Sequence, residues 1–206
     1  MVTLWAISDG LFAMDWMQVI EIAAATIGLI YVWLELKASV WLWPVGIVLP
    51  LFWIYISWHS EVYGNVLVNI YYIIACVWGW REWLKHKKEG TTDAVRPISF
   101  IGKRTLLWVV AIAVALALLL APAYDRFMQS PFPYWDGIAT SVSFVGMWLL
   151  AKKYMENWYC WVLSNVIYSC LYFVQGFTIS GIFFTLYTAI AIAGYFNWRR
   201  MMHIQS

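Results

Sequence analysis

The stretch TLLWVVAIAVALALLLAPAY, residues 105–124, decides how the rest of this chain can fold. It is apolar on all sides and contains no charged side chain. A helix rises 1.5 Å per residue, so such a segment covers the roughly 30 Å hydrocarbon core of a bilayer. We therefore predict a membrane-spanning helix over residues 104–123.

The composition of the whole chain agrees with a membrane location. Of its 206 residues, 64% are hydrophobic and 12% are charged. A soluble domain is typically about 45–50% apolar and about 25% charged. Such an excess of apolar side chains would expose aggregation-prone patches in water. We predict an all-α integral membrane protein with almost no domain outside the membrane.

Seven membrane-spanning helices can be drawn, preceded by an interfacial segment over residues 1–16. The predicted spans are 17–37, 40–58, 64–84, 104–123, 134–151, 157–175 and 181–199. All Lys and Arg residues except Arg126 fall on one side of this arrangement. Positive charge marks the cytoplasmic side, so we expect the N-terminus outside and the C-terminus in the cytoplasm.

An internal repeat relates the first three spans to the last three. A shift of 115 residues aligns them without a gap and superimposes an acid on an acid, a lysine on a lysine and several aromatic residues. The pairs are Glu21 with Asp136, Trp33 with Trp148, Lys37 with Lys152, Trp43 with Trp158, Tyr72 with Tyr187, Gly79 with Gly194, and Trp83 with Trp198. So many matches in one register favour duplication over chance.

The fourth span has no counterpart in this repeat. It returns the chain to its starting side, so the two three-helix bundles, residues 17–84 and 134–199, are parallel. The connection 85–103 is then a cytoplasmic loop, and the helix 104–123 is a linker between the bundles. Paired repeats with a binding site between them are a transporter architecture.

The sequence offers no constellation for catalysis. The three histidines fall at span ends or in loops, and we find no Walker A or dinucleotide-binding motif. The three cysteines lack the spacing of a zinc or redox site. We therefore expect no enzyme activity, no cofactor, no metal and no nucleic-acid partner. Without an ATP site or a mid-membrane charged relay, energy-independent passage down a gradient is the simplest hypothesis.

Neutral polar and aromatic side chains within the spans are the candidate binding residues. Trp158, Trp161 and Asn165 follow an i, i+3, i+7 spacing and share one helix face. The other candidates are Asn69, Tyr72, Gln175, Tyr187 and Trp43. An amide in hydrocarbon must be hydrogen-bonded, so each amide either joins helices or binds a ligand. Indole faces with amides suit a flat, neutral or monocationic solute.

Two acids, Glu21 and Asp136, occupy equivalent positions of the two repeats. They either lie among the outer headgroups, where a carboxylate costs little, or act as a pair that binds a cation or gates the path. The residues alone leave both interpretations open.

The stretch KKYMENWYCWVLSNV, residues 152–166, resembles the signature of the PnuC family of bacterial vitamin transporters through its W-x-x-W-x-x-x-N core. FPYWD at 132–136, FVQG at 173–176 and GWREW at 79–83 are similar to that family in the same order. The resemblance implies a SWEET-like fold of three, one and three helices in the bacterial inner membrane, assembled as a homotrimer. It further implies facilitated diffusion of nicotinamide riboside, which a cytoplasmic kinase then phosphorylates and traps.

The same resemblance assigns Trp158, Trp161 and Asn165 to substrate binding. Two positions depart from it: Asn69 stands where the family carries glutamine, and Cys76 where members often carry asparagine. Both departures concern the substrate rather than the fold. Thiamine, another flat cation, and riboflavin are the alternative substrates.

Overall fold

A computed structural model describes residues 16–59, 63–85, 97–128 and 130–205; for residues 16–25, 56 and 205 it describes the backbone alone. All but the last residue of the predicted interfacial segment 1–16, and most of the loop 85–103, therefore lie outside the described residues. Within the described ranges the chain forms seven α-helices and no strand.

The helices match the seven predicted spans in order and within a few residues at most boundaries. They are α2 (Trp16–Leu36), α3 (Leu42–His59), α4 (Tyr63–Leu84), α5 (Lys103–Met128), α6 (Pro133–Ala151), α7 (Asn157–Val174) and α8 (Thr178–Gln205). Two helices extend further than predicted: α5 continues through Pro122 to Met128, and α8 continues past Arg199. The prediction of an all-α, seven-helix fold is confirmed.

Three of the described helices are both long and apolar enough to cross a membrane by length and composition: α3, α5 and α8. The other four have 18 to 22 residues, which is also sufficient length. Polar side chains lower the mean hydropathy of α4, α6 and α7. Several of these, such as Asn69, Thr140 and Ser164, are buried inside the protein and face no lipid.

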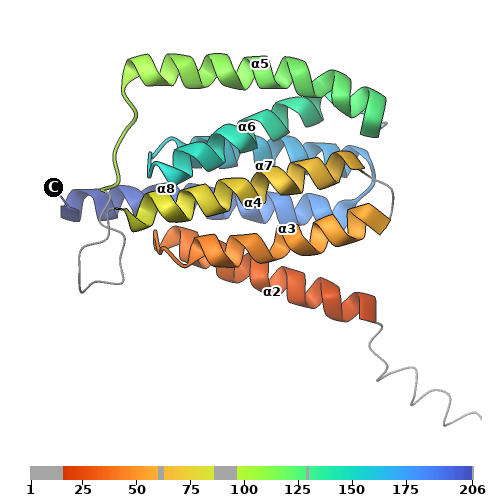
Figure 1. Ribbon diagram of the computed structural model, residues 1–206, viewed down its shortest axis with the longest axis horizontal. Coiled ribbons are helices and arrows are strands. Elements are labelled where there is room, and N and C mark those ends of the chain that lie inside the picture. The colour runs from red at the N-terminus through yellow and green to blue at the C-terminus, as the bar shows by residue number, and fades with distance from the viewer. Residues whose placement is uncertain (1–15, 60–62, 86–96, 129, 206) are drawn as a thin grey trace, which may run out of the picture.

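Figure 1 shows α2 and α6 running in the same direction, as do α3 and α7, and α4 and α8. The long helix α5 lies along one edge of the molecule and packs on α6, whereas α2 lies along the opposite edge. Between the two repeats, α4 contacts α6 and α2 contacts α8. These two contacts are equivalent under the repeat. The two bundles are therefore related by a pseudo-twofold axis that runs along the helices.

The turn that follows the first helix of each repeat is duplicated in atomic detail. After α2, the amide of Ser39 donates to the carbonyl of Leu34; after α6, Tyr154 donates to Leu149 in the same way. The residues preceding these donors, Ala38 and Lys153, both have positive φ values, 49° and 52°. Two non-glycine residues in this uncommon conformation, 115 positions apart, indicate that the repeat includes the backbone.

A tryptophan packed on a glycine holds the second and third helices of each repeat together. A Cβ atom placed on Gly79 would lie 2.3 Å from the ring of Trp43, and one on Gly194 would lie 2.3 Å from the ring of Trp158. Each indole also meets a second tryptophan edge-on: Trp43 meets Trp83, with ring centroids 5.3 Å apart. In the second repeat the corresponding separation, between Trp158 and Trp198, is 5.4 Å.

The third helix of each repeat caps the first helix of the other. Indole Nε1 of Trp83 donates to the carbonyl of Ala151 at 3.0 Å, and that of Trp198 donates to the carbonyl of Glu35 at 2.9 Å. The residue before each tryptophan adds a second link. Asn197 donates to the Leu36 carbonyl at 2.8 Å, and Glu82 forms an ion pair of 2.7 Å with Lys152.

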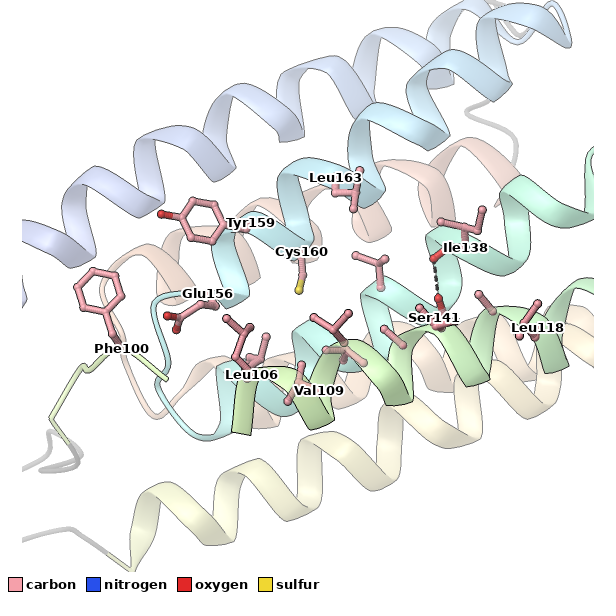
Figure 2. A pocket seen from close by; sticks show the side chains of 17 residues that line it. Phe100, Leu106, Val109, Leu118, Ile138, Ser141, Glu156, Tyr159, Cys160 and Leu163 are labelled. Carbon is pink, nitrogen blue, oxygen red and sulfur yellow. Dashed lines mark hydrogen bonds between the residues drawn. The ribbon is translucent and has the colours of Figure 1, made fainter. Parts of the chain in front are cut away.

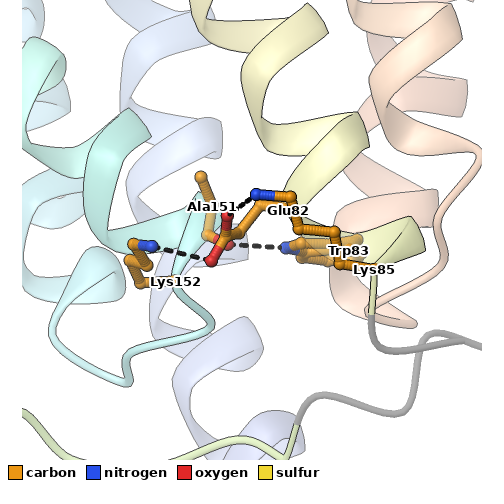
Figure 3. A network of polar contacts seen from close by, with 5 residues as sticks. All are labelled: Glu82, Trp83, Lys85, Ala151 and Lys152. Carbon is orange, nitrogen blue, oxygen red and sulfur yellow. Dashed lines mark hydrogen bonds and ion pairs between the residues drawn. The ribbon is translucent and has the colours of Figure 1, made fainter.

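Figure 3 shows the first of these caps, where Glu82 also pairs with Lys85 at 3.5 Å. The last carbonyls of a helix have no partner within it. The Trp83 indole supplies a partner to the carbonyl of Ala151, whereas the carbonyl of Glu35 accepts from the amide of Ala38 and gains a second hydrogen bond from the Trp198 indole. The two bundles are thus cross-linked at the ends where α2 and α6 terminate.

Replacing Gly79 by serine is expected to destabilise the protein by about 1–3 kcal/mol, because the new side chain overlaps the Trp43 ring. The measurement is thermal unfolding of the purified protein in detergent. Gly102→Ser is the matched control, since a Cβ there meets nothing within 4 Å. Equal melting temperatures for the two variants would contradict the account of this contact.

Candidate functional site

Three cavities lie between the helices of the two repeats, and Trp161 of α7 lines all of them. Their volumes are about 440, 280 and 240 Å³. Asn165 lines the first two cavities, and Tyr72 of α4 lines the first and third. Because they share lining residues, with Trp161 common to all, we refer to these three adjoining cavities together as the passage.

The i, i+3, i+7 spacing on α7 does place three predicted residues along this passage, but their environments differ. Trp158 is only 2% exposed, because its ring is fixed between Gly194 and Trp198. Trp161 and Asn165 are half-buried and border open volume. Trp161 and Asn165 are therefore free to contact a solute, whereas Trp158 supports the wall behind them.

The predicted amides Asn69 and Asn165 differ in their hydrogen bonding. Asn69 donates to the backbone carbonyl of Asn65 at 2.8 Å and to its side-chain oxygen at 3.2 Å, while Asn65 donates to Ser57 on α3 at 2.7 Å. Asn69 belongs to a chain of hydrogen bonds that joins α4 to α3. Asn165 makes no side-chain hydrogen bond to any other residue in the described ranges. Since a half-buried amide needs partners, Asn165 is suited to bind water or a solute.

The largest of the three cavities is also the most polar. The hydroxyl groups of Tyr124, Thr140 and Tyr168 form a chain with separations of 2.7 and 2.9 Å. Asp136 lies at the start of α6 on the same cavity and accepts a hydrogen bond from Ser130. Its position at the mouth of the passage agrees with a role in gating, which stays a prediction.

Three predicted site residues are not brought together with the others. Trp43 is fully buried against Gly79 and Trp83 and lines none of the cavities described above, because the contact that holds its ring leaves no space beside it. Gln175 lies at the C-terminal cap of α7 and lines none of them either. The side chain of Glu21 lies outside the described residues.

The structure adds residues to the passage that the sequence interpretation missed. Glu35 and Tyr31 of α2 line it beside Trp161, and Thr140 and Tyr168 line its polar end. Glu35 stands two residues from Lys37 near the predicted end of the first span, so the pattern indicated an interfacial acid. Its burial, with 5% of its surface exposed, is a tertiary effect of α8 packing on this turn.

The largest hollow in the described structure, about 810 Å³, lies elsewhere (Figure 2). It is a groove between α5, α6 and α7, lined almost wholly by aliphatic side chains such as Leu106, Val109 and Leu163. The helix α5 that forms one wall is largely exposed and strongly apolar, so this groove faces lipid. A groove open to hydrocarbon is unsuited to a polar solute, so the cavities between the bundles are the candidate site.

Residues 18–200 match the model of a family described as nicotinamide mononucleotide transporter. The chain belongs to this family. It is a multi-pass membrane transporter and not an enzyme. The resemblance noted from the W-x-x-W-x-x-x-N motif is confirmed.

The names of related transporters state more than one substrate. The nicotinamide riboside transporter PnuC of Escherichia coli is 26% identical over 166 residues, which cover 69% of either chain. That of Neisseria mucosa is 24% identical, over 87% of this chain and 71% of its own. The riboflavin/roseoflavin transporter RibM of Streptomyces davaonensis is 23% identical, over 84% of this chain and 80% of its own.

The fold also matches a solved structure. A crystal structure of the vitamin B3 transporter PnuC superimposes with a TM-score of 0.69 at 22% identity, covering 98% of this chain and 88% of the other. This likeness supports the arrangement of three, one and three helices.

A cysteine introduced at Asn165 should react with a charged methanethiosulfonate reagent at least about tenfold faster than one at Val166, because thiols react as thiolates in water. Asn165 borders the passage, whereas its neighbour Val166 is exposed on the outside of α7. The measurement is the labelling rate in a background where Cys76, Cys160 and Cys170 are replaced. Equal rates at the two positions would show that the passage holds no water.

Proposed function

We propose that this transporter carries a flat, cationic vitamin, with nicotinamide riboside as the first candidate, by energy-independent facilitated diffusion. The observation that carries the proposal is the combination of Trp161 and Asn165 on one face of α7, bordering the passage between the repeats. The names of the Escherichia coli and Neisseria mucosa relatives support the choice of vitamin.

The chemistry of the passage suits such a solute. The indole of Trp161 can stack on an aromatic ring, and the attraction is stronger when the ring is positively charged. The Asn165 amide can both donate to and accept from a carboxamide, and the hydroxyl groups of Tyr168 and Thr140 can meet ribose hydroxyls. No Lys or Arg is among the described residues that line the three cavities, so a phosphate has no partner there.

A cationic vitamin needs no coupling ion to enter a cell. The inside-negative membrane potential favours entry of one positive charge by about 2.3 kcal/mol per 100 mV. A passive path therefore supports uptake, and phosphorylation by a cytoplasmic kinase would trap the product by adding negative charge. This trapping step is part of the proposal.

Thiamine is the second candidate, because it is also a flat cation and would stack on Trp161 equally well. Asn69 and Cys76, the two departures from the family pattern, both border the smallest cavity. The amide of Asn69 is committed to Asn65, which leaves this part of the passage with less hydrogen-bonding capacity for ribose. Riboflavin is the neutral alternative, suggested by the similarity to RibM.

We further propose a homotrimer in the bacterial inner membrane, with the N-terminus outside and the C-terminus in the cytoplasm. The orientation is supported by Lys37, Lys152 and Arg199. The first two follow the ends of α2 and α6, the third lies in the C-terminal part of α8, and these three helices run in the same direction (Figure 1). Assembly is supported by the family resemblance and by the largely exposed apolar surface of α5.

Binding should depend on Asn165 and Trp161. Asn165→Leu and Trp161→Ala are each expected to weaken binding of the transported vitamin by about tenfold or more, through loss of hydrogen bonds and of stacking respectively. The measurement is isothermal titration of the purified protein with nicotinamide riboside, thiamine and riboflavin. Gln175→Leu, outside the three cavities, should leave affinity unchanged; unchanged affinity in both site variants would remove the site assignment.

Transport should respond to voltage and to no other energy source. In proteoliposomes without kinase, labelled nicotinamide riboside should equilibrate without a potential, and should accumulate about 50-fold at an inside-negative potential of about 100 mV. A neutral vitamin would not accumulate under either condition. Accumulation without a potential, or a requirement for a proton or sodium gradient, would contradict the passive mechanism.

A further inference from the structure

Glu35 is an acid buried in the last turn of α2 at the end of the passage opposite Asp136. It shares the 280 Å³ cavity with Trp161, Asn165 and Tyr187. With 5% of its surface exposed, it is more deeply buried than a carboxylate tolerates without compensation. Neither the repeat nor the sequence motifs assigned it a role.

The backbone of Glu35 is tied down, while its side chain is not. Its carbonyl accepts hydrogen bonds from the Trp198 indole and from the amide of Ala38, both at 2.9 Å. The carboxylate oxygen Oε1 has no hydrogen-bond partner among the described residues. The Trp161 indole lies next to this carboxylate, yet the two groups do not form a hydrogen bond, and Trp161 Nε1 is likewise unpartnered in the described structure.

The nearby cations are engaged elsewhere. Lys37, two residues on, lies over the Trp33 ring with its Nζ 4.1 Å from the centroid. Lys152 pairs with Glu82 on α4. No described Lys or Arg lines the cavity that Glu35 faces. Among the described residues, the buried carboxylate therefore has no cationic partner.

The repeat shows that the fold does not require an acid here. The position equivalent to Glu35 in the second repeat is Leu150, which is fully buried. The backbone hydrogen bonds are the same in both: Ala38 donates to the carbonyl of Glu35, and Lys153 donates to that of Leu150. A leucine meets the packing needs of this turn, so the carboxylate in the first repeat serves another purpose.

We propose that Glu35 is the counter-ion of the transported solute, and that the cavity it shares with Trp161 selects permanently cationic rings over neutral ones. A pyridinium or thiazolium ring stacked on Trp161 would place its positive charge beside this carboxylate. This inference rests on the proposed function and narrows it: nicotinamide riboside and thiamine are ligands of this cavity, and riboflavin is not.

The test compares matched pairs of ligands that differ in charge. Nicotinamide riboside is compared with its neutral dihydro form, and thiamine with neutral deazathiamine, by isothermal titration of the full-length protein. The wild type should bind the cation of at least one pair about 30-fold more tightly than its neutral partner. Glu35→Gln should remove most of this preference by weakening the cation alone.

Two further variants separate a binding role from a structural one. Glu35→Leu introduces the side chain that the second repeat carries at Leu150, so this variant should fold. It should also lose the preference for the cation, as Glu35→Gln does. Glu82→Gln removes a carboxylate of the inter-bundle ion pair and should leave the preference intact. Melting temperatures of the three variants report their folding.

The outcomes are distinct. A wild-type preference for the cation that survives in Glu35→Gln and Glu35→Leu overturns the counter-ion role while leaving the proposed function standing. Tight binding of riboflavin with no preference in either pair overturns the selection for cations. Failure of the folded wild type to bind any of these vitamins overturns the proposed function and this inference together.

Discussion

Two reciprocal hydrogen bonds organise this transporter: the indole of Trp83 caps the helix that ends at Ala151, and the indole of Trp198 caps the end of α2 at Glu35. Each bond runs from the third helix of one repeat to the first helix of the other. At Ala151 the indole satisfies a carbonyl that the helix end leaves unpaired, which would be costly in an apolar interior. At Glu35 the indole adds to the hydrogen bond from the amide of Ala38. The same bonds fix the distance between the bundles, and therefore the width of the passage.

Further tryptophans support the caps on the side of the protein where α2 and α6 end. Behind each capping indole, a second tryptophan fills the space over a glycine: Trp43 over Gly79, and Trp158 over Gly194. The polar cavity near Asp136 lies at the other end. In our proposal the solute binds at Trp161, between this cavity and the side that carries the packed tryptophans and the Glu82–Lys152 pair. Under this proposal, release on that side would require these contacts to separate or to move together with their bundle.

Much of this architecture could be predicted from the sequence, because duplication leaves a register that needs no structure to detect. The shift that pairs Trp43 with Trp158 also relates α3 to α7, whose bounds agree residue for residue. The face shared by Trp161 and Asn165 follows from helical periodicity alone. What periodicity cannot show is which aromatic residue borders open space.

Trp43 and Glu35 illustrate the limit. Trp43 and Trp158 occupy equivalent positions of the two repeats and are both predicted to bind substrate, but each ring packs on a glycine 36 residues away, Gly79 and Gly194 respectively. Glu35 follows an apolar run and precedes a lysine, a pattern typical of a membrane interface. Only the packing of α8 on the turn after α2 buries it. Both cases are decided by contacts distant in sequence.

The most direct test of the central claim is an experimental structure of the protein with its vitamin bound. The account predicts the ring stacked on Trp161, with the amide of Asn165 in hydrogen-bond contact and the positive charge turned toward Glu35. Density for the vitamin in the groove between α5 and α7, or away from Trp161, would contradict it.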